Sequence, residues 1–308
     1  MADGHPGHQV RSAAPEAHTI EQCHIPSGTF TMGDQHGDGY PSDGEQPVHQ
    51  VTVPAFSIDA TTVTNRDFAG FVEATGYQTE AQRWGFSAVF HLAVSPTAKI
   101  LGNAPRTPWW LTVEGADWAH PEGPDSDIES RADHPVVHVA HTDARAYCAW
   151  AGRRLPSEVE WERASRGGRE GLRFPWGDDT RDAHGAWLLN IWQGTFPTEN
   201  TLEDGYLTTA PVRTFAPNDF GLWQSVGNVW EWCADVFDPA AYARRAGRSG
   251  LHPLPDDPTS ARVLRGGSYL CHDSYCNRYR NSARTANTPD SSMGNAGFRT
   301  VLLQSDHE

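Results

Sequence analysis

The chain has 308 residues, 38% of them hydrophobic, which is enough for one large domain or two ordinary ones. Its 24 Lys and Arg residues against 39 Asp and Glu residues give a net charge of −15, so nucleic acid and anionic membrane surfaces are disfavoured as partners. No apolar run approaches the roughly 18 residues that a transmembrane helix needs. With 29 Gly, 22 Pro and no internal repeat, the composition favours a single loop-rich domain.

The two ends of the chain are polar. Residues 1–19 are rich in His, Gly and Pro and lack the apolar core of a signal peptide, so we expect a flexible tail there. The folded domain is predicted over residues 20–304, followed by a short tail at 305–308. The five cysteines are irregularly spaced, unlike a secreted disulfide framework, which favours the reducing cytoplasm.

The first elements predicted along the chain are three short strands over residues 29–32, 49–53 and 56–58. An acidic loop at 33–47 joins the first two strands. It carries four carboxylates, Asp34, Asp38, Asp43 and Glu45. We expect a solvated surface loop there, with a role at a cation or at the rim of a groove as the alternative.

Three amphipathic helices follow, with capping residues at their starts. The helix over 64–76 has Thr64 as N-cap and Gly76 as its stop, the helix over 142–152 has Thr142 as N-cap, and Ser157 opens a short helix that ends near residue 167. The segment between Gly76 and residue 135 has weak periodicity. Its aromatic sequence PWW at 108–110 indicates an ordered segment that lines a groove.

The stretch from residue 265 to 280 contains Cys271 and Cys276. A strand is expected at 263–265, and two glycines then break it. Side chains five residues apart on a strand point to opposite faces, so a bend must bring the two thiols together. Such a pair can form a disulfide, a redox pair or half of a soft-metal site, and Arg278 and Arg280 would favour the thiolate form if they approach the sulfurs.

Three loops carry hard oxygen ligands, at 190–194, 203–206 and 224–231. Calcium takes six to eight oxygens from carboxylates, amides and backbone carbonyls, but none of these loops has the EF-hand spacing. Ordinary turn-forming Asn and Asp residues are the alternative. No Cys-x2-Cys pattern accompanies the 15 histidines, so a zinc site is not expected, and Cys23, Cys148 and Cys233 are interpreted as buried structural residues.

Ten motifs give the sequence a resemblance to the formylglycine-generating enzymes, or sulfatase-modifying factors, from about residue 22 to 302. In chain order they are GTFTMG (28–33), PWW (108–110), HPVVH (134–138), WAGRRLPSEVEW (150–161), NIWQG (190–194), GNVWEW (227–232), LRGGS (264–268), CHDSYC (271–276), NTPDSS (287–292) and GFR (297–299). Many relatives share only GNVWEW and RGGS, so the cysteine pair is the motif specific to the oxidase.

The resemblance implies an α+β fold of one domain with C-type-lectin-like topology and little regular structure. It implies a cytoplasmic, monomeric oxidase that converts the cysteine of a Cys-x-Pro-x-Arg segment in an unfolded client sulfatase to Cα-formylglycine. Cys271 and Cys276 would bind Cu(I), with the client cysteine as a third thiolate. Dioxygen would be the co-substrate, a Cβ hydrogen would be abstracted, and an external thiol would serve as reductant.

The resemblance also implies roles for individual residues. Ser268, Trp230 and Tyr275 match positions around the copper and dioxygen pocket, and Ser87, Trp109 and Asn295 match substrate contacts. One structural Ca²⁺ would be held by Asn190, Ile191, Asp204 and Tyr206. A second would be held by Gln224, Gly227, Val229 and Glu231, with Gln224 standing where an Asn is usual.

Two departures separate the chain from eukaryotic members. Thr300 stands at the disulfide partner position of Cys148, and Ser165 and Ser282 occupy another pair, which fits a bacterial-type enzyme. Phe86 replaces an acidic residue near the client arginine. The competing interpretations are a non-catalytic lectin-like binding module, a thiol-oxidising relative with a small-molecule substrate, and the iron-dependent sulfoxide synthases of this fold, whose additional helical domain is missing here.

Overall fold

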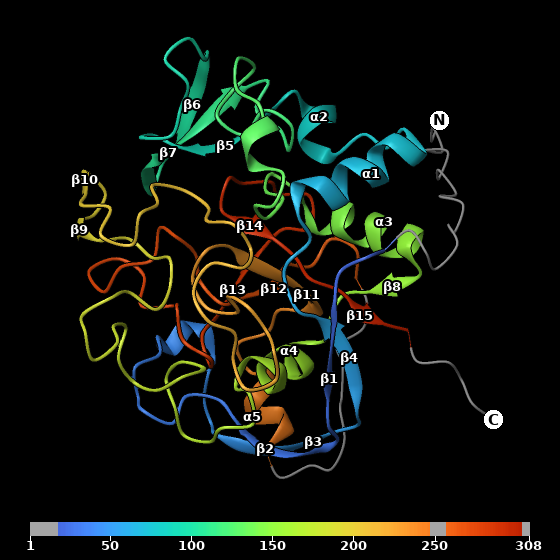
Figure 1. Cartoon of the computed structure of the whole chain (residues 1–308), viewed down its shortest axis with the longest axis vertical. Helices are drawn as coiled ribbons and strands as arrows, with labels where there is room; N and C mark the ends of the chain where they lie inside the picture. Colours follow the sequence, from blue (N-terminus) through green and yellow to red (C-terminus); the bar gives the residue numbers. More distant parts are fainter. Residues whose placement is uncertain (1–17, 247–256, 304–308) are drawn as a thin grey trace.

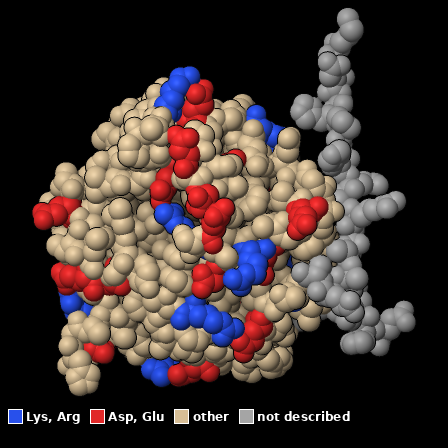
Figure 2. Space-filling model, turned by 45° about the horizontal axis from the view of Figure 1, so that its top comes forward, with Lys and Arg blue, Asp and Glu red and all other residues tan. Residues whose placement is uncertain are grey.

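The computed structural model describes residues 18–246 and 257–303 (Figure 1). Short strands and long loops surround five α-helices, and several small sheets replace one large sheet. The predicted α+β class is therefore confirmed. None of the helices in these ranges is long and apolar enough to cross a bilayer. On the face drawn in Figure 2, acidic and basic side chains are interspersed, so this face offers no continuous basic surface.

Two four-stranded sheets organise the chain. The first has the order β1 (Gln22–Ile25), β4 (Phe56–Asp59), β15 (Val301–Leu302) and β8 (Arg153–Arg154). The second has the order β13 (Arg284–Asn287), β12 (Arg262–Arg265), β11 (Trp230–Val236) and β14 (Ala296–Gly297). Strands β11 and β12 are antiparallel, with Glu231 opposite Arg265.

Three smaller sheets complete the β-structure. A hairpin joins β2 (Gly28–Met32) to β3 (His49–Val53), and a second pairs β9 (Gly194–Thr195) with β10 (Glu199–Asn200). The third sheet has the order β5 (Phe86–Phe90), β7 (Thr107–Glu114) and β6 (Ile100–Ala104). It lies in the segment of weak periodicity between Gly76 and residue 135, which is ordered as predicted, although the sequence did not predict its strands. The mixed exposure of these strands hides the alternation that sequence analysis looks for.

The helices are α1 (Asn65–Thr75), α2 (Glu80–Trp84), α3 (His141–Ala151), α4 (Glu158–Ser165) and α5 (Ala241–Arg245), with 3₁₀ turns at Pro41–Asp43 and Glu129–Arg131. Thr64 and Ser157 cap α1 and α4 as predicted, each within a capping box. The predicted Thr142 cap of α3 is wrong. The helix starts earlier because the Asp143 carboxylate accepts the Ala140 N–H at 2.8 Å.

The largest apolar core lies between α1, α3 and the β11–β12 strands. It contains Phe68, Tyr147, Trp232 and Leu264, and it reaches as far as Cys271. Cys23, Cys148 and Cys233 are buried free thiols, as predicted. The start of the domain is corrected, because the His18 ring lies 2.8 Å from Asp59 and 3.1 Å from the Tyr147 hydroxyl. Residues 1–17 of the predicted N-terminal tail, the predicted C-terminal tail at 305–308 and residue 304 at the predicted end of the domain lie outside the described residues.

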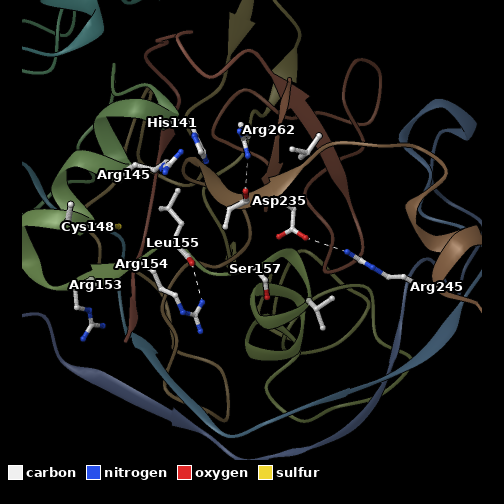
Figure 3. A pocket seen from close by; sticks show the side chains of 14 residues that line it. His141, Arg145, Cys148, Arg153, Arg154, Leu155, Ser157, Asp235, Arg245 and Arg262 are labelled. Carbon is white, nitrogen blue, oxygen red and sulfur yellow. Dashed lines mark hydrogen bonds and ion pairs between the residues drawn. The ribbon is translucent and has the colours of Figure 1, made fainter. Parts of the chain in front are cut away.

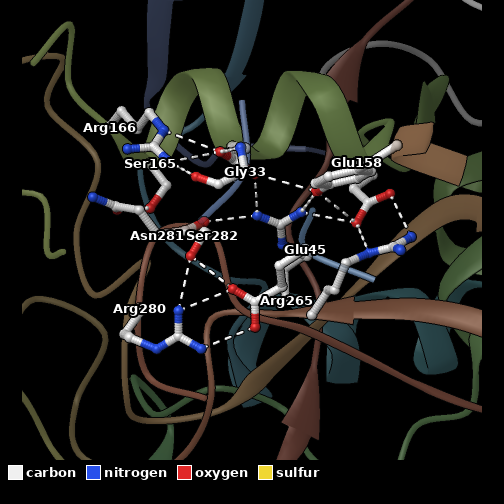
Figure 4. A network of polar contacts seen from close by, with 12 residues as sticks. Gly33, Glu45, Glu158, Ser165, Arg166, Arg265, Arg280, Asn281 and Ser282 are labelled. Atoms are coloured by element: carbon white, nitrogen blue, oxygen red, sulfur yellow. Dashed lines mark hydrogen bonds and ion pairs between the residues drawn. The ribbon is translucent and has the colours of Figure 1, made fainter. Parts of the chain in front are cut away.

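A buried ionic network joins α4 to the strand that leads into the cysteine stretch (Figure 4). The Arg265 guanidinium is fully buried and donates to Glu158 at 2.8 Å and to Glu162 at 2.6 Å. Arg284 donates to Glu158 at 2.6 and 2.9 Å. Burial alone would raise the pKa of Glu158, but the charges of Arg284, Arg265 and Arg245 lower it to about 2.

This network predicts a large loss of stability on removing one carboxylate. We expect Glu158→Gln to lower the free energy of unfolding by about 3–5 kcal/mol, because buried guanidinium groups are left uncompensated. Urea unfolding at neutral pH measures the change. The matched control is Glu114→Gln, which removes an exposed pair with Lys99 and should cost less than about 1 kcal/mol. Equal effects of the two substitutions would contradict a structural role for the network.

Candidate active site

The cysteine stretch leaves β12 through two glycines with positive φ. Gly266 has φ 92°, and a Cβ atom there would lie 2.6 Å from the Ser225 carbonyl oxygen. Gly267 has φ 74°, and a Cβ atom there would lie 2.7 Å from the Arg278 carbonyl oxygen. Both positions therefore require glycine. The turn directs the following loop back across the end of the sheet.

The predicted bend between the two cysteines is present. The carbonyl oxygen of His272 accepts the N–H groups of Tyr275 at 2.9 Å and of Cys276 at 2.7 Å. The Sγ atoms of Cys271 and Cys276 lie 3.2 Å apart, and both residues are buried free thiols. The bend thus brings together two sulfurs that a straight strand would separate.

The two thiols have different electrostatic surroundings. The hydrogen bond from the Cys271 thiol and the positive charge of Arg278 stabilise the thiolate form of Cys276, whereas burial opposes it. The net effect lowers the pKa of Cys276 to about 7. Nη1 of Arg278 lies 3.9 Å from the Cys276 sulfur. Burial and the neighbouring sulfur raise the pKa of Cys271. Of the two sulfurs, Cys276 is therefore the one whose thiolate form is favoured.

Of the two flanking arginines, only Arg278 approaches a sulfur. Its guanidinium also donates to Asp43, at 3.0 Å from Nη2. Arg280 forms a bidentate pair with Glu45, both bonds being 2.9 Å. The expectation that the acidic loop is solvated is therefore wrong, since Asp34, Asp43 and Glu45 are 2–5% exposed. Asp34 is stabilised locally, by the N–H groups of His36, Gly37 and Gly39, whereas Asp43 and Glu45 are stabilised by arginines that lie far away in sequence.

The thiols open into a cavity of about 470 Å³. Of the predicted site residues, Trp230, Ser268, Tyr275 and Asn295 line it beside the cysteines. The Asn295 amide donates to the Ser268 hydroxyl at 2.9 Å, and the Ser268 backbone N–H donates to the Cys271 sulfur at 3.4 Å. The structure thus brings the residues predicted around the copper and dioxygen pocket, together with Asn295, to one cavity.

An aromatic cluster packs around Tyr275, which lines the cavity beside the thiols. The Tyr275 ring stacks on Phe196 with a centroid distance of 4.3 Å, and Trp109 meets the Tyr275 ring edge-on at 4.9 Å. Trp109 lies outside the cavity lining, whereas its neighbour Trp110 is part of it. Burial raises the pKa of Tyr275 to about 12, so its hydroxyl stays protonated. Tyr275 lies in the cavity wall beside the sulfurs, and Phe196 and Trp109 pack against its ring.

Ser87 does not line the cavity but contacts Ser292, which does. It also contacts His138, a residue to which the sequence analysis assigned no role. The Ser87 hydroxyl lies 2.8 Å from that of Ser292, which lines the cavity, and 2.7 Å from Nδ1 of His138. Nε2 of His138 lies 2.8 Å from the carbonyl oxygen of Pro121, so this nitrogen carries the proton and Nδ1 accepts from Ser87. The HPVVH motif contained His138, but no spacing rule connected it to Ser87.

The first expected calcium ligands lie together. Asp204 accepts the N–H groups of Ile191 at 3.2 Å and Tyr206 at 3.0 Å, and burial raises the pKa of this carboxyl. The side-chain oxygen of Asn190 is buried and has no hydrogen-bond partner among the described residues. A carboxylate beside an unsatisfied amide oxygen and backbone carbonyls is a donor set that suits calcium. These residues fit the ion.

The second expected calcium set fits less well. The Glu231 carboxylate is fully buried and accepts two bonds from Arg299, at 2.6 and 2.7 Å, and one from the Trp161 indole at 2.7 Å. Its charge is already balanced. The side-chain oxygen of Gln224 is a buried acceptor without a partner in the described residues, while Gly227 and Val229 offer only carbonyls. Within the described ranges, no group of three His, Cys, Asp or Glu side chains gathers as a metal site.

Comparison with known proteins places this geometry in a family. A sequence model described as the sulfatase-modifying factor enzyme 1-like domain matches residues 8–303. The chain belongs to the sulfatase-modifying factor family. It is 57% identical to a formylglycine-generating enzyme of Streptomyces coelicolor, covering 93% of this chain and 90% of that protein, and 50% identical to the Mus musculus enzyme of the same name, covering 89% and 73%.

Sulfatase-modifying factor relatives also include proteins that are named inactive. An inactive Cα-formylglycine-generating enzyme 2 of Mus musculus is 44% identical, over 90% of this chain and 83% of that protein. Among solved structures, PvdO from Pseudomonas aeruginosa is similar with a TM-score of 0.64 at 24% identity, covering 92% of this chain and 94% of that one. That likeness confirms the fold prediction alone. Family membership therefore does not by itself decide whether this chain is active.

The environment of His138 predicts a pH-dependent stability term. Burial lowers the pKa of His138 to about 4, against about 6.5 in the unfolded chain. Its stabilising contribution is complete above pH 6.5 and is lost as pH falls towards 4, at about 1.4 kcal/mol per pH unit. His138→Asn keeps a polar group facing Ser87 and removes the titration. Urea unfolding between pH 6.5 and 4 should give a shallower pH slope for the variant, and identical slopes would contradict the assignment.

Proposed function

We propose that the chain is a formylglycine-generating oxidase, which converts the cysteine of a Cys-x-Pro-x-Arg segment in an unfolded sulfatase to Cα-formylglycine. The observation that carries the proposal is the pair of buried thiols, Cys271 and Cys276, 3.2 Å apart at the wall of an open cavity. The names of the similar Streptomyces and mouse proteins support the reaction. The thiol pair matters because the family also contains members named inactive.

The two cysteines would hold Cu(I), since two convergent thiolates select a soft ion. Copper bound there would supply the one-electron chemistry with dioxygen that a protein side chain cannot provide. Cys276 is prepared for this role by Arg278, which favours its thiolate form. In the net reaction the client cysteine and dioxygen take up two electrons and two protons from an external thiol reductant, yielding the aldehyde, hydrogen sulfide and water.

The remaining cavity residues would prepare the client and protect the chemistry. Tyr275 and Trp230 would exclude bulk water from the reacting sulfur. The Ser268 hydroxyl, held by Asn295, would orient a small polar reactant beside Cys271. Ser292, supported by Ser87 and His138, would offer a fixed hydroxyl to the backbone of an extended client. We infer a cytoplasmic, monomeric protein, in line with the free cysteines.

Turnover of a synthetic Cys-x-Pro-x-Arg peptide tests the proposal. With Cu(I), dioxygen and a thiol reductant present, mass spectrometry should show the peptide cysteine converted to an aldehyde. Cys271→Ser and Cys276→Ser should each lower the rate by at least about 1,000-fold, because a ligand is lost. Cys148→Ser, which alters a buried thiol in α3 outside the cavity, is the matched control. Absence of aldehyde with the wild-type protein would sink the oxidase proposal and favour a binding module.

Calcium is proposed as a structural ion at Asn190, Ile191, Asp204 and Tyr206. Calcium at about a hundred times its Kd should raise the Tm by roughly 5 °C over the value in EGTA. Asp204→Asn should abolish this shift. The control is Glu203→Gln, its exposed neighbour in the chain, which is paired with Arg181 and should retain the shift. An unchanged shift in Asp204→Asn would place the ion elsewhere.

A further inference from the structure

Two cavities of similar size differ in how their polar side chains are satisfied. The first, of about 530 Å³, lies between α3, β8, α4, the end of β11 and α5 (Figure 3). There Arg154 pairs with Glu160 at 2.6 Å and Arg245 pairs with Asp235 at 3.3 Å, so these charges are balanced within the wall. In the thiol cavity, by contrast, the buried side-chain oxygen of Asn295 has no hydrogen-bond partner among the described residues. An unsatisfied buried acceptor indicates that a ligand donates a hydrogen bond at this wall.

A chain of three hydrogen bonds leads to the same wall, and its far end fixes the direction of each bond. Burial lowers the pKa of His138 to about 4, so the ring is neutral around neutral pH and carries a single proton. That proton is on Nε2, because the carbonyl oxygen of Pro121, 2.8 Å away, can only accept. Nδ1 therefore accepts from the Ser87 hydroxyl, at 2.7 Å.

The direction of this chain decides which way the Ser292 hydroxyl points. Ser87 has one hydroxyl hydrogen, which it donates to His138. The oxygens of Ser87 and Ser292 lie 2.8 Å apart, so in this contact Ser292 is the donor. The Ser292 oxygen is left with lone pairs, and no hydrogen, toward the cavity that it lines. Ser292 thus presents an acceptor to a ligand.

Backbone contacts hold the segment around Ser292 independently of this chain. The Met293 carbonyl oxygen accepts the His138 N–H at 3.0 Å, and the Gly294 N–H donates to the carbonyl oxygen of Ala88 in β5, also at 3.0 Å. The fold keeps His138 fully buried at φ 56°, a strained conformation for a residue other than glycine. Loss of one side chain from the chain of hydrogen bonds should therefore change the direction of the Ser292 hydroxyl more than its position.

We propose that His138 is a positioning residue, which acts through Ser87 to hold the Ser292 hydroxyl as the acceptor for a backbone N–H group of the client. An extended peptide offers such donors whatever its side chains are. The fixed polarity admits an N–H group at this point and disfavours a carbonyl oxygen, because two facing acceptors repel each other. It therefore helps to set the register of the client relative to the thiols. This inference rests on the proposed function, since its ligand is the proposed client.

Equilibrium binding of backbone-substituted peptides tests this role separately from turnover. A labelled Cys-x-Pro-x-Arg peptide is compared, by fluorescence anisotropy, with analogues in which one backbone N–H at a time is replaced by an ester oxygen. The full-length protein carries Cu(I) and the buffer is anaerobic, so that no product forms. At one position the ester should bind the wild type at least about five-fold more weakly than the amide, because a hydrogen bond is lost and two acceptors then face each other.

Three variants identify the acceptor and the residues that orient it. Ser292→Ala should lower the ester-to-amide ratio of Kd at that position to less than half the wild-type value. Ser87→Ala and His138→Phe should do the same, since the released Ser292 hydroxyl can turn and donate to the ester oxygen. A merely structural role of His138 would weaken both peptides equally and leave the ratio unchanged. Ser95→Ala, which removes a hydroxyl contact with Thr97 outside the cavity, is the matched control and should keep the wild-type ratio.

Ser87→Ala keeps the test decisive if His138→Phe fails to fold. The inference is overturned if no ester position reaches about five-fold in the wild type, or if Ser292→Ala or Ser87→Ala keeps the wild-type ratio. Its failure is distinguishable from that of the proposed function. Aldehyde formation under turnover conditions without an ester-sensitive position would overturn this inference alone, whereas an ester-sensitive position that depends on Ser292 and Ser87, without aldehyde formation, would overturn the oxidase alone.

Discussion

The pairing of Arg265 with Glu158 and Glu162 is the interaction on which the rest of the site depends. Arg265 ends strand β12, and the two glycines that follow turn the chain toward Cys271. A fully buried guanidinium must lie against its carboxylate partners, so these ion pairs fix the start of the site loop. The carboxylates come from one short helix, α4, whose own start is set by a capping box at Ser157.

The far side of the site loop is held in the same way by the acidic loop. Arg278, Arg280 and Arg284 follow the cysteines at two-residue or four-residue spacing, and each binds a buried acidic partner or a carbonyl from a distant segment. Between these anchors the chain has little regular secondary structure. Ionic contacts therefore replace a hydrogen-bonded ladder in fixing the geometry of the thiols. Arg278 serves two purposes, since it anchors the loop to Asp43 and also favours the thiolate of Cys276.

Local patterns predicted the local features well. The sequence predicted the capping boxes at Thr64 and Ser157, the strand before Gly266 and the bend between Cys271 and Cys276. Each of these features depends on neighbours within five residues. The sequence did not predict the burial of Glu45 and Asp43, because carboxylates in loops are usually solvated. The arginine partners of these two residues lie more than 200 residues away in the chain. The same limit applies to His138, whose contacts with Ser87 and Pro121 are set only by tertiary packing.

Family membership alone does not assign an activity, because the family includes proteins named inactive; the proposed activity depends on metal binding by Cys271 and Cys276. Under the proposed function, the two sulfurs at hydrogen-bond distance, one of them favoured as a thiolate, would form the donor set for a soft cation. Copper K-edge X-ray absorption of the protein loaded with one equivalent of Cu(I) tests this role most directly. The account predicts a ligand shell of two sulfur atoms that is lost in Cys271→Ser, whereas a shell of nitrogen and oxygen, or one unchanged by that substitution, would contradict it.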